Sequence, residues 1–156
     1  MNLRNRSFLR SLGSLLVLAG CGLAGAAMAQ VRTETVASGL ENPWGVAFLP
    51  DGRFVVTEKP GRLRLVAADG KLGAPIQGLP PIAAGGQGGL LDVLVDSGFA
   101  QNRTLYFCYS EPEAAGGSAN STALARARLS AGGTKLGALQ VIFSQKAKVA
   151  CRADFG

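Results

Sequence analysis

Turn-forming residues recur so closely after residue 43 that the runs between them have the length of strands. Pro50-Asp51-Gly52, Pro60-Gly61 and Asp69-Gly70 each end in a glycine that accepts positive φ. The intervening runs are apolar or alternate between apolar and polar residues, which is typical of half-buried strands. We therefore expect four short strands, at residues 44–49, 53–58, 62–66 and 71–76.

The same cycle returns in the second half of the chain. Further strands are expected at residues 89–95, 104–110, 122–129 and 139–144, and the Gly-, Ala- and Ser-rich residues 111–121 are expected to form a surface loop. No segment keeps the 3.6-residue period of a helix. Four strands joined by tight turns match one propeller blade better than half of a sandwich. We predict an all-β chain with two four-stranded blades of a β-propeller, with a generic all-β fold as the alternative.

Two blades do not close a ring. A propeller usually has four to eight blades, and stacked repeats bury a continuous core only where neighbours are present. We therefore expect residues 30–156 to be the N-terminal part of a larger propeller.

The first 29 residues have the pattern of an export signal. Arg4, Arg6 and Arg10 precede an uncharged stretch at residues 12–29 that is rich in Gly and Ala after Val17. A basic start, a short apolar stretch and small residues before a cleavage point define a secretory signal peptide. A membrane-spanning helix is the alternative, because the uncharged stretch barely reaches across a bilayer.

Two cleavage points compete within this leader. Ala27-Met28-Ala29 before Gln30 fits the small-x-small rule, which gives a signal peptide at residues 1–29. Leu18-Ala19-Gly20-Cys21 resembles a lipobox, which leaves Cys21 as a lipid-carrying N-terminus. In either case we expect a periplasmic protein, which contacts a membrane only if Cys21 is lipidated.

The charge of the chain lies largely in this leader. The formal net charge is +6, but from Gln30 onward 13 basic and 10 acidic residues leave +3. So small and scattered an excess does not provide a phosphate-binding surface, so no nucleic-acid partner is expected. The chain contains no histidine, which excludes a Ser-His-Asp triad and a Cys/His zinc finger.

Two cysteines remain beyond the leader, Cys108 and Cys151. They form an even pair in an oxidising compartment and can bridge. Cys108, however, lies in an apolar run, where a buried free thiol is the commoner outcome.

Four segments together resemble a known family of enzymes. The chain is similar to the soluble glucose/sorbosone dehydrogenases, aldose sugar dehydrogenases that use pyrroloquinoline quinone (PQQ). The resemblance covers about residues 31–155, which correspond to the N-terminal third of a family member. It implies a six-bladed propeller with the quinone and a calcium ion in a cleft at the top of its channel. The four segments are residues 42–52, 56–63, 86–93 and 99–103.

The resemblance implies a cofactor contact at Gln87. This residue matches the family glutamine that hydrogen-bonds the quinone, and its neighbours Gly85, Gly86, Gly88 and Gly89 let a flat cofactor approach the backbone closely. A neutral amide both donates and accepts hydrogen bonds, which suits a carbonyl-rich ligand. From spacing alone, the alternative is a loop that enters an inner strand, with Gln87 in solvent.

The family's catalytic base has no clear counterpart. Where the resemblance implies a histidine that takes the proton of the anomeric hydroxyl, this chain has Asp154, directly before Phe155-Gly156. A carboxylate can accept a proton, but aspartate is shorter and has a lower ordinary pKa. Residues 30–156 also offer no metal ligands by resemblance, so most PQQ and calcium contacts are expected from later blades.

Two readings of function follow. The first is a periplasmic quinoprotein oxidoreductase that oxidises C1 of an aldose or sugar aldehyde, here as an N-terminal portion inactive alone, with an unidentified electron acceptor. The alternative is a non-catalytic propeller fragment, from truncation or a frameshift, or a binding module. Trp44 is expected to pack in the core at a blade start rather than to stack on a sugar, and Arg126 and Arg128 are expected on a solvated strand face.

Overall fold

The computed structural model describes residues 31–113 and 119–150. Of these, the residues from Glu34 onward belong to one compact unit. The elements of this part of the chain are β1 (Pro43–Phe48), β2 (Phe54–Glu58), β3 (Arg62–Val66), β4 (Leu72–Pro75), β5 (Leu90–Val95), α1 (Phe99–Asn102), β6 (Thr104–Pro112), β7 (Ala119–Leu129), β8 (Leu136–Ser144) and β9 (Val149–Ala150).

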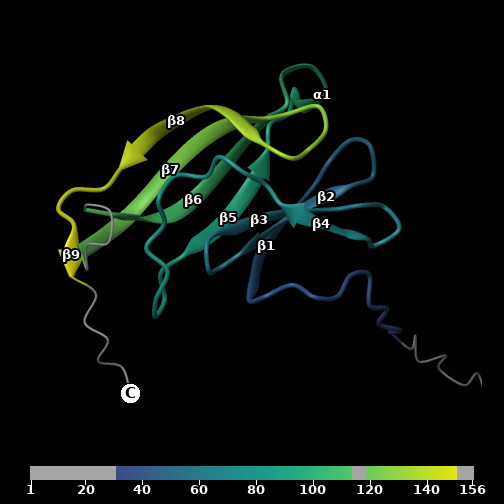
Figure 1. Cartoon of the computed structure of the whole chain (residues 1–156), viewed down its shortest axis with the longest axis horizontal. Coiled ribbons are helices and arrows are strands. Elements are labelled where there is room, and N and C mark those ends of the chain that lie inside the picture. Colours follow the sequence, from purple (N-terminus) through teal and green to yellow (C-terminus); the bar gives the residue numbers. More distant parts are fainter. Residues whose placement is uncertain (1–30, 114–118, 151–156) are drawn as a thin grey trace, which may run out of the picture. The chain divides into compact units, whose positions relative to one another are not determined.

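The first four strands form one antiparallel sheet in chain order (Figure 1). The three glycines of the predicted turns, Gly52, Gly61 and Gly70, have φ of 84°, 103° and 83°. A side chain is strained at such angles, so glycine at these places allows the tight reversals. The four strands predicted for this half of the chain are confirmed, with bounds that differ by one residue at most.

The next four strands form a second antiparallel sheet, also in chain order, and β9 pairs with β7. The predicted surface loop at 111–121 was too long. The β6–β7 ladder continues through the pairs Glu111 with Ser121 and Pro112 with Asn120. Regular pairing extends there because each strand satisfies the backbone groups of the other, which outweighs the weak strand preference of the small residues.

Buried side chains of both sheets belong to one hydrophobic cluster. On β7 the buried positions alternate with exposed or half-buried residues, and three of the five buried residues are alanines, between Ser121 and Leu129. Arg126 and Arg128 lie on the exposed face of this strand, as predicted. The cluster comprises Ala47, Leu49, Val55, Leu63, Ile76, Leu90, Val93, Phe99, Leu105, Phe107, Tyr109, Ala123, Ala125, Ala127, Leu129 and Leu136.

Thr57 of β2 ties the two sheets together. Its side chain is fully buried, and its hydroxyl accepts the N–H of Gly45 at 2.8 Å. The same hydroxyl donates to the carbonyl oxygen of Leu91 in β5 at 2.5 Å. One side chain therefore satisfies backbone groups of β1 and of the second sheet at once.

β1 and β5 approach each other at a glycine. A Cβ built on Gly45 would lie 2.8 Å from a carboxylate oxygen of Asp92 and 3.2 Å from the Thr57 hydroxyl. Any larger residue would push the strands apart, so the absence of a side chain at position 45 is a condition for this junction.

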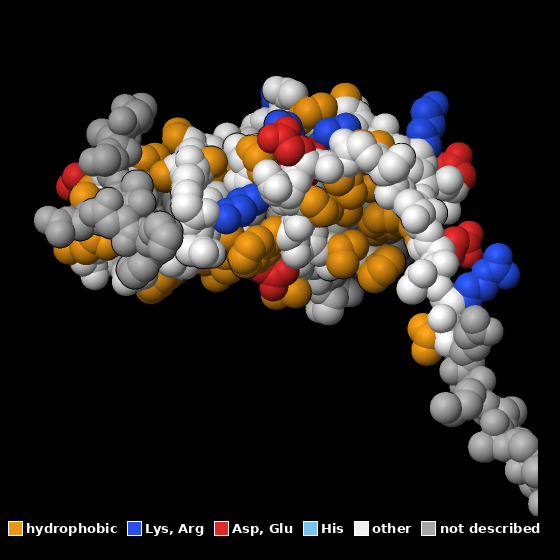
Figure 2. Space-filling view, turned by 90° about the horizontal axis from the view of Figure 1, so that it is seen from below, with side chains coloured by type: hydrophobic (Ala, Val, Ile, Leu, Met, Phe, Trp, Pro, Cys, Tyr) orange, Lys and Arg blue, Asp and Glu red, His pale blue; other side chains and the backbone are white. Residues whose placement is uncertain are grey.

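Trp44 is not in the core, contrary to the prediction. Its exposed fraction is 56%, and Val46 and Phe48 on the same strand are 51% and 72% exposed. β1 alternates, so that Gly45 and Ala47 face the second sheet while these three apolar residues point away from it. The space-filling view in Figure 2 shows hydrophobic side chains gathered in neighbouring patches on one face of the molecule.

Glu58 is a buried carboxylate on the other face of β2. It accepts hydrogen bonds from the N–H of Glu41 at 2.5 Å, from Nε of Arg62 at 2.7 Å and from Nη1 of Arg64 at 3.3 Å. Burial by itself raises the pKa of Glu58, but these hydrogen bonds and the charge of Arg62 outweigh it, so the pKa lies below its ordinary value. Glu58 is therefore ionised and holds the segment before β1 to β3.

In residues 31–113 and 119–150, no helix is long and apolar enough to cross a bilayer. The predicted leader, with both of its cleavage points, lies outside these ranges.

Replacing Thr57 by valine tests the junction between the sheets. T57V keeps the shape but leaves the N–H of Gly45 and the carbonyl of Leu91 without their partner, so the free energy of unfolding should fall by about 1–3 kcal/mol in chemical denaturation. The control T122V changes an exposed threonine of β7 and should stay within about 0.5 kcal/mol of the parent. Equal losses in the two variants would contradict the role given to Thr57.

Replacing Glu58 by glutamine tests the buried ion pairs through pH. Because the folded-state pKa of Glu58 is below the ordinary glutamate value of about 4.3, its stabilisation is complete above that pH and is lost as the pH falls through the folded pKa. E58Q should have a free energy of unfolding that is lower than the parent's by roughly 1.5–3 kcal/mol at neutral pH. This difference should shrink in acid. The control E34Q changes an exposed carboxylate. If the difference in the free energy of unfolding between E58Q and the parent stays constant down to about pH 3, this account is wrong.

Candidate functional site

A glycine-rich turn before β5 carries Gln87 near its tip. The N–H of Gly88 donates to the carbonyl of Gly85 at 2.7 Å, and the N–H of Gly85 donates to the carbonyl of Gly88 at 3.3 Å. These two bonds close a two-residue hairpin loop formed by Gly86 and Gln87, with Gly86 at φ 50°. The loop leaves Gln87 exposed.

Ser110 of β6 holds the base of this turn from within the second sheet. Its backbone accepts the N–H of Ala83 and donates to the carbonyl of Gly89, both at 2.9 Å, and its hydroxyl accepts the N–H of Gly89 at 3.1 Å. A Cβ at Gly88 would lie 2.9 Å from that hydroxyl. Gly88 and Gly89 are therefore packed against β6 and buried.

Lys59, in the turn between β2 and β3, holds the same segment from the first sheet. Its carbonyl accepts the N–H of Leu90 at 3.1 Å, and its Nζ donates to the carbonyl of Gly86 at 2.5 Å. Nζ also lies 5.6 Å from the ring centroid of Trp44, within the range of a cation–π interaction. Trp44 and Lys59 therefore lie beside the Gln87 turn, a grouping that sequence reasoning missed.

The tip of the turn is open to a ligand. Cβ atoms built on Gly85 and Gly86 would have nothing within 4 Å. Within the described part of the chain, the Gln87 amide has no hydrogen-bond partner. An unengaged amide beside accessible backbone can pair with a flat ligand that carries carbonyl or carboxylate oxygens.

A second polar cluster lies where β6, β7 and β8 end or begin. The carboxylate of Glu111 accepts hydrogen bonds from Nζ of Lys148 and from the hydroxyl of Ser144, both at 2.5 Å. These two partners lower the pKa of Glu111, so the carboxylate is ionised and paired. Sequence reasoning had placed Glu111 in a loop, and only its pairing with Ser121 on β7 brings it to this place.

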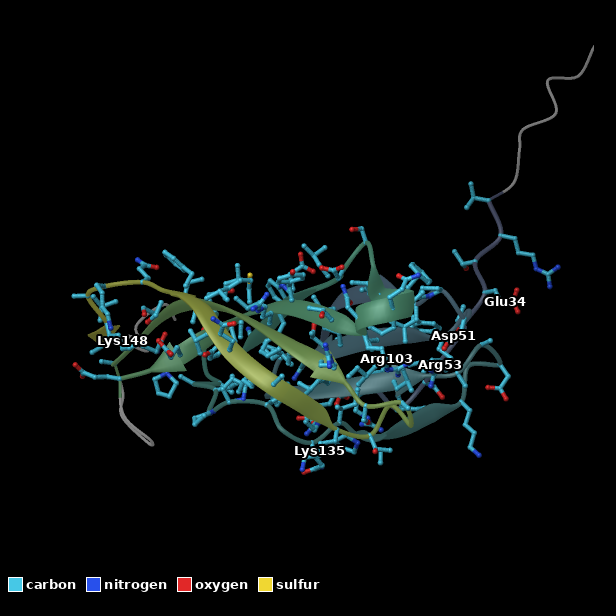
Figure 3. All side chains as sticks on the ribbon, turned by 90° about the horizontal axis from the view of Figure 1, so that it is seen from above. Glu34, Asp51, Arg53, Arg103, Lys135 and Lys148 are labelled. Atoms are coloured by element: carbon cyan, nitrogen blue, oxygen red, sulfur yellow. The ribbon has the colours of Figure 1, made fainter. Side chains whose placement is uncertain are left out.

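Figure 3 shows Lys148 at one end of the molecule and Asp51, Arg53 and Arg103 toward the other. Arg103 donates to the carbonyls of Leu129 and Ser130 and thereby caps the end of β7. Two shallow hollows, of about 180 and 430 Å³, adjoin Arg128 and Ala138. They do not include Gln87, so the site rests on the geometry of the turn rather than on a cavity.

The other sequence-predicted positions contribute less. Asp154, proposed at the place of the base, and Cys151 lie outside the described residues. Cys108 is half-buried, and burial together with the charge of Asp92 raises the pKa of its thiol. Both expectations for it, a free thiol and a pair with Cys151, stay predictions. Asp96 accepts hydrogen bonds from Asn102, Gly98 and Tyr106, and it thereby caps the turn between β5 and α1.

Residues 31–113 and 119–150 contain no group of three or more His, Cys, Asp or Glu side chains that could hold a metal ion. The carboxylates of Glu111 and Asp96 each accept hydrogen bonds from neighbouring donors. The described residues therefore offer no cluster of carboxylates for a calcium ion.

Comparison with known proteins gives one family. The model of the family described as Glucose / Sorbosone dehydrogenase matches residues 40–156. Aldose sugar dehydrogenase YliI of Escherichia coli (strain K12) is 39% identical over 132 residues, which are 84% of this chain and 35% of that protein. The chain thus spans about a third of the length of this relative.

Solved structures agree with this assignment. A glucose dehydrogenase has a TM-score of 0.70 at 43% identity, over 74% of this chain and 33% of its own. The soluble aldose sugar dehydrogenase of Escherichia coli in its apo-form gives 0.68 at 38% identity, over 74% and 33%. The PQQ-bound aldose sugar dehydrogenase of Streptomyces coelicolor gives 0.61 at 25% identity, over 72% and 33%.

These likenesses confirm the predicted all-β fold as part of a β-propeller, of which two blades are described. The sequence motifs, the order of the strands and the matched family model lead to the same assignment. The chain belongs to the glucose/sorbosone dehydrogenase family.

Proposed function

We propose that this chain forms the N-terminal part of a periplasmic sugar dehydrogenase that uses PQQ to oxidise C1 of an aldose or sugar aldehyde. The observation that carries the proposal is the exposed Gln87 turn, held between two blades, in a chain 39% identical to an aldose sugar dehydrogenase. A structural relative from Streptomyces coelicolor is a PQQ-bound form, which supports this cofactor.

The turn fits a flat quinone with carboxylate and carbonyl oxygens. Gly85 and Gly86 leave room beside the backbone, and the Gln87 amide can donate to a cofactor oxygen. PQQ, when bound, accepts the two electrons and the hydrogen that leave C1 as a hydride, while the hydroxyl proton goes to a base. In this proposal Gln87 binds and orients the cofactor and transfers no proton itself.

For the base, the position implied by the family holds Asp154. We propose that Asp154 takes the role of accepting the proton of the anomeric hydroxyl. Aspartate has an ordinary pKa of about 3.9, far below the working range of a histidine, so it is a weak base near neutral pH. Burial would raise that pKa toward the useful range.

Two further features belong to the proposal. Residues 1–29 direct export to the periplasm, with cleavage after Ala29 or lipidation of Cys21. The calcium ion implied by the family would take its ligands from other blades, because the described residues offer no cluster of carboxylates for it. The electron acceptor is a separate molecule whose nature this chain does not indicate.

The second candidate is a chain that binds the cofactor without turnover. It is favoured by the absence of histidine and by Asp154 in the place of the base. The two candidates share the Gln87 contact and differ in the chemistry that follows.

Replacing Gln87 tests the cofactor contact that both candidates share. Q87A removes one hydrogen bond to a polar ligand and should weaken binding of PQQ about tenfold, equivalent to about 1.4 kcal/mol, in equilibrium dialysis of the 156-residue chain. The control Q101A changes an exposed glutamine of α1, beyond the far end of β5, and should bind as the parent does. If Q87A binds PQQ as tightly as the parent does, the proposed contact between Gln87 and PQQ is wrong.

Turnover tests whether the 156-residue chain is active alone, and only a positive result would separate the two candidates. With PQQ, calcium and glucose, the 156-residue chain should reduce no redox dye, because Asp154 is a poor base and the chain spans only about a third of its relatives. An intact aldose sugar dehydrogenase assayed in parallel controls for the cofactor and the dye. Glucose-dependent dye reduction by this chain would instead favour the catalytic candidate.

A further inference from the structure

Lys59 contacts the segment that carries Gln87 at three successive points. Its carbonyl oxygen receives the N–H of Leu90 at 3.1 Å. Its stem lies against Gly89, where a Cβ would be 2.7 Å from Cγ of the lysine and 2.2 Å from its carbonyl oxygen. Its Nζ reaches the carbonyl of Gly86 at 2.5 Å. The lysine therefore runs along the turn from its base to its tip.

The ammonium group is itself held in place. It lies over the indole of Trp44, 5.6 Å from the ring centroid, and the stem is half-buried. A free lysine has several rotatable bonds, so a hydrogen bond from it normally costs conformational entropy. Contact with the ring and with Gly89 reduces that cost and directs the ammonium at Gly86.

In the described part of the chain, the base of the turn has several anchors, whereas its tip has one. Ser110 bonds Ala83 and Gly89, at the base of the turn. The hydrogen bond that the structure shows to the Gly86–Gln87 tip from outside the turn comes from Lys59. The base is thus held from both sheets, by Ser110 and by the backbone and stem of Lys59, whereas the tip is held by the ammonium group of Lys59.

We propose that Lys59 is a positioning residue for Gln87, with Trp44 as the platform of its ammonium group. Its effect on cofactor binding rests on the proposed function, whereas its effect on the turn does not. Lys59 of the first blade then sets the position at which the Gln87 amide meets its ligand, although Gln87 lies in the segment that leads into the second blade.

The first test measures the turn without any cofactor. K59M removes the ammonium and keeps an apolar stem, and K59R keeps a cation that can donate and lie over the ring. In hydrogen–deuterium exchange, the peptide containing Gly85 to Gly89 should exchange about tenfold faster in K59M and as the parent in K59R. K135M, which changes an exposed lysine before β8, is the matched control and should leave this peptide unchanged.

Fluorescence provides a second readout, because Trp44 is the single tryptophan of the chain. Its emission should change in K59M, and K59R and K135M should keep the spectrum closer to that of the parent. Unchanged exchange at the turn together with unchanged emission in K59M would overturn the proposal. If K59M no longer unfolds cooperatively, K59Q takes its place in both measurements.

The link to the cofactor is tested by a double-mutant cycle. Since Lys59 is proposed to act through Gln87, K59M should weaken PQQ binding severalfold in the parent and add nothing in Q87A. Additive losses would overturn positioning, because Lys59 would then contact the cofactor itself. If Q87A alone has no effect on PQQ binding, the proposed function fails, and the exchange result alone decides whether Lys59 holds the turn.

Discussion

The hydroxyl of Thr57 fixes how the two sheets meet. The hydroxyl is buried. It accepts a hydrogen bond from the N–H of Gly45 in the first sheet and at the same time donates one to the carbonyl of Leu91 in the second sheet. Because an unpaired polar group at such a place costs free energy, the two sheets are held in the arrangement that satisfies all three groups. That arrangement brings Lys59 against the chain that leads into β5.

The candidate site depends on this junction, because neither sheet builds it alone. Ser110 of β6 fixes the base of the Gln87 turn, and Lys59 of the first sheet reaches its tip. A propeller blade packs against its neighbours and a shared core forms only between them. A functional side chain placed at such a junction is therefore sensitive to changes in either blade. A loss of junction contacts would displace Gln87 before it disrupts the strands.

Local chemistry predicted the strands but not the contacts between them. The positive φ of Gly52, Gly61 and Gly70 follows from residue type, and so do the short strands that these glycines separate. The apolar run of β1 suggested a buried Trp44, but alternation turns this residue outward. Gln87 came from family resemblance. The hydrogen bond from Lys59 to the carbonyl of Gly86, the residue before it, joins positions 27 residues apart along the chain, which no short-range pattern encodes.

The glycine run around Gln87 serves two purposes that the sequence does not separate. Resemblance assigned all four glycines to the close approach of a cofactor. In the structure, Cβ atoms on Gly88 and Gly89 would meet Ser110 and Lys59 at 2.9 and 2.2 Å, whereas Gly85 and Gly86 face open space. Gly88 and Gly89 are thus required by the protein's own packing, and only Gly85 and Gly86 are free to admit a ligand. A motif that looks uniform in sequence is divided by the fold into a structural half and a binding half, with Gln87 between them.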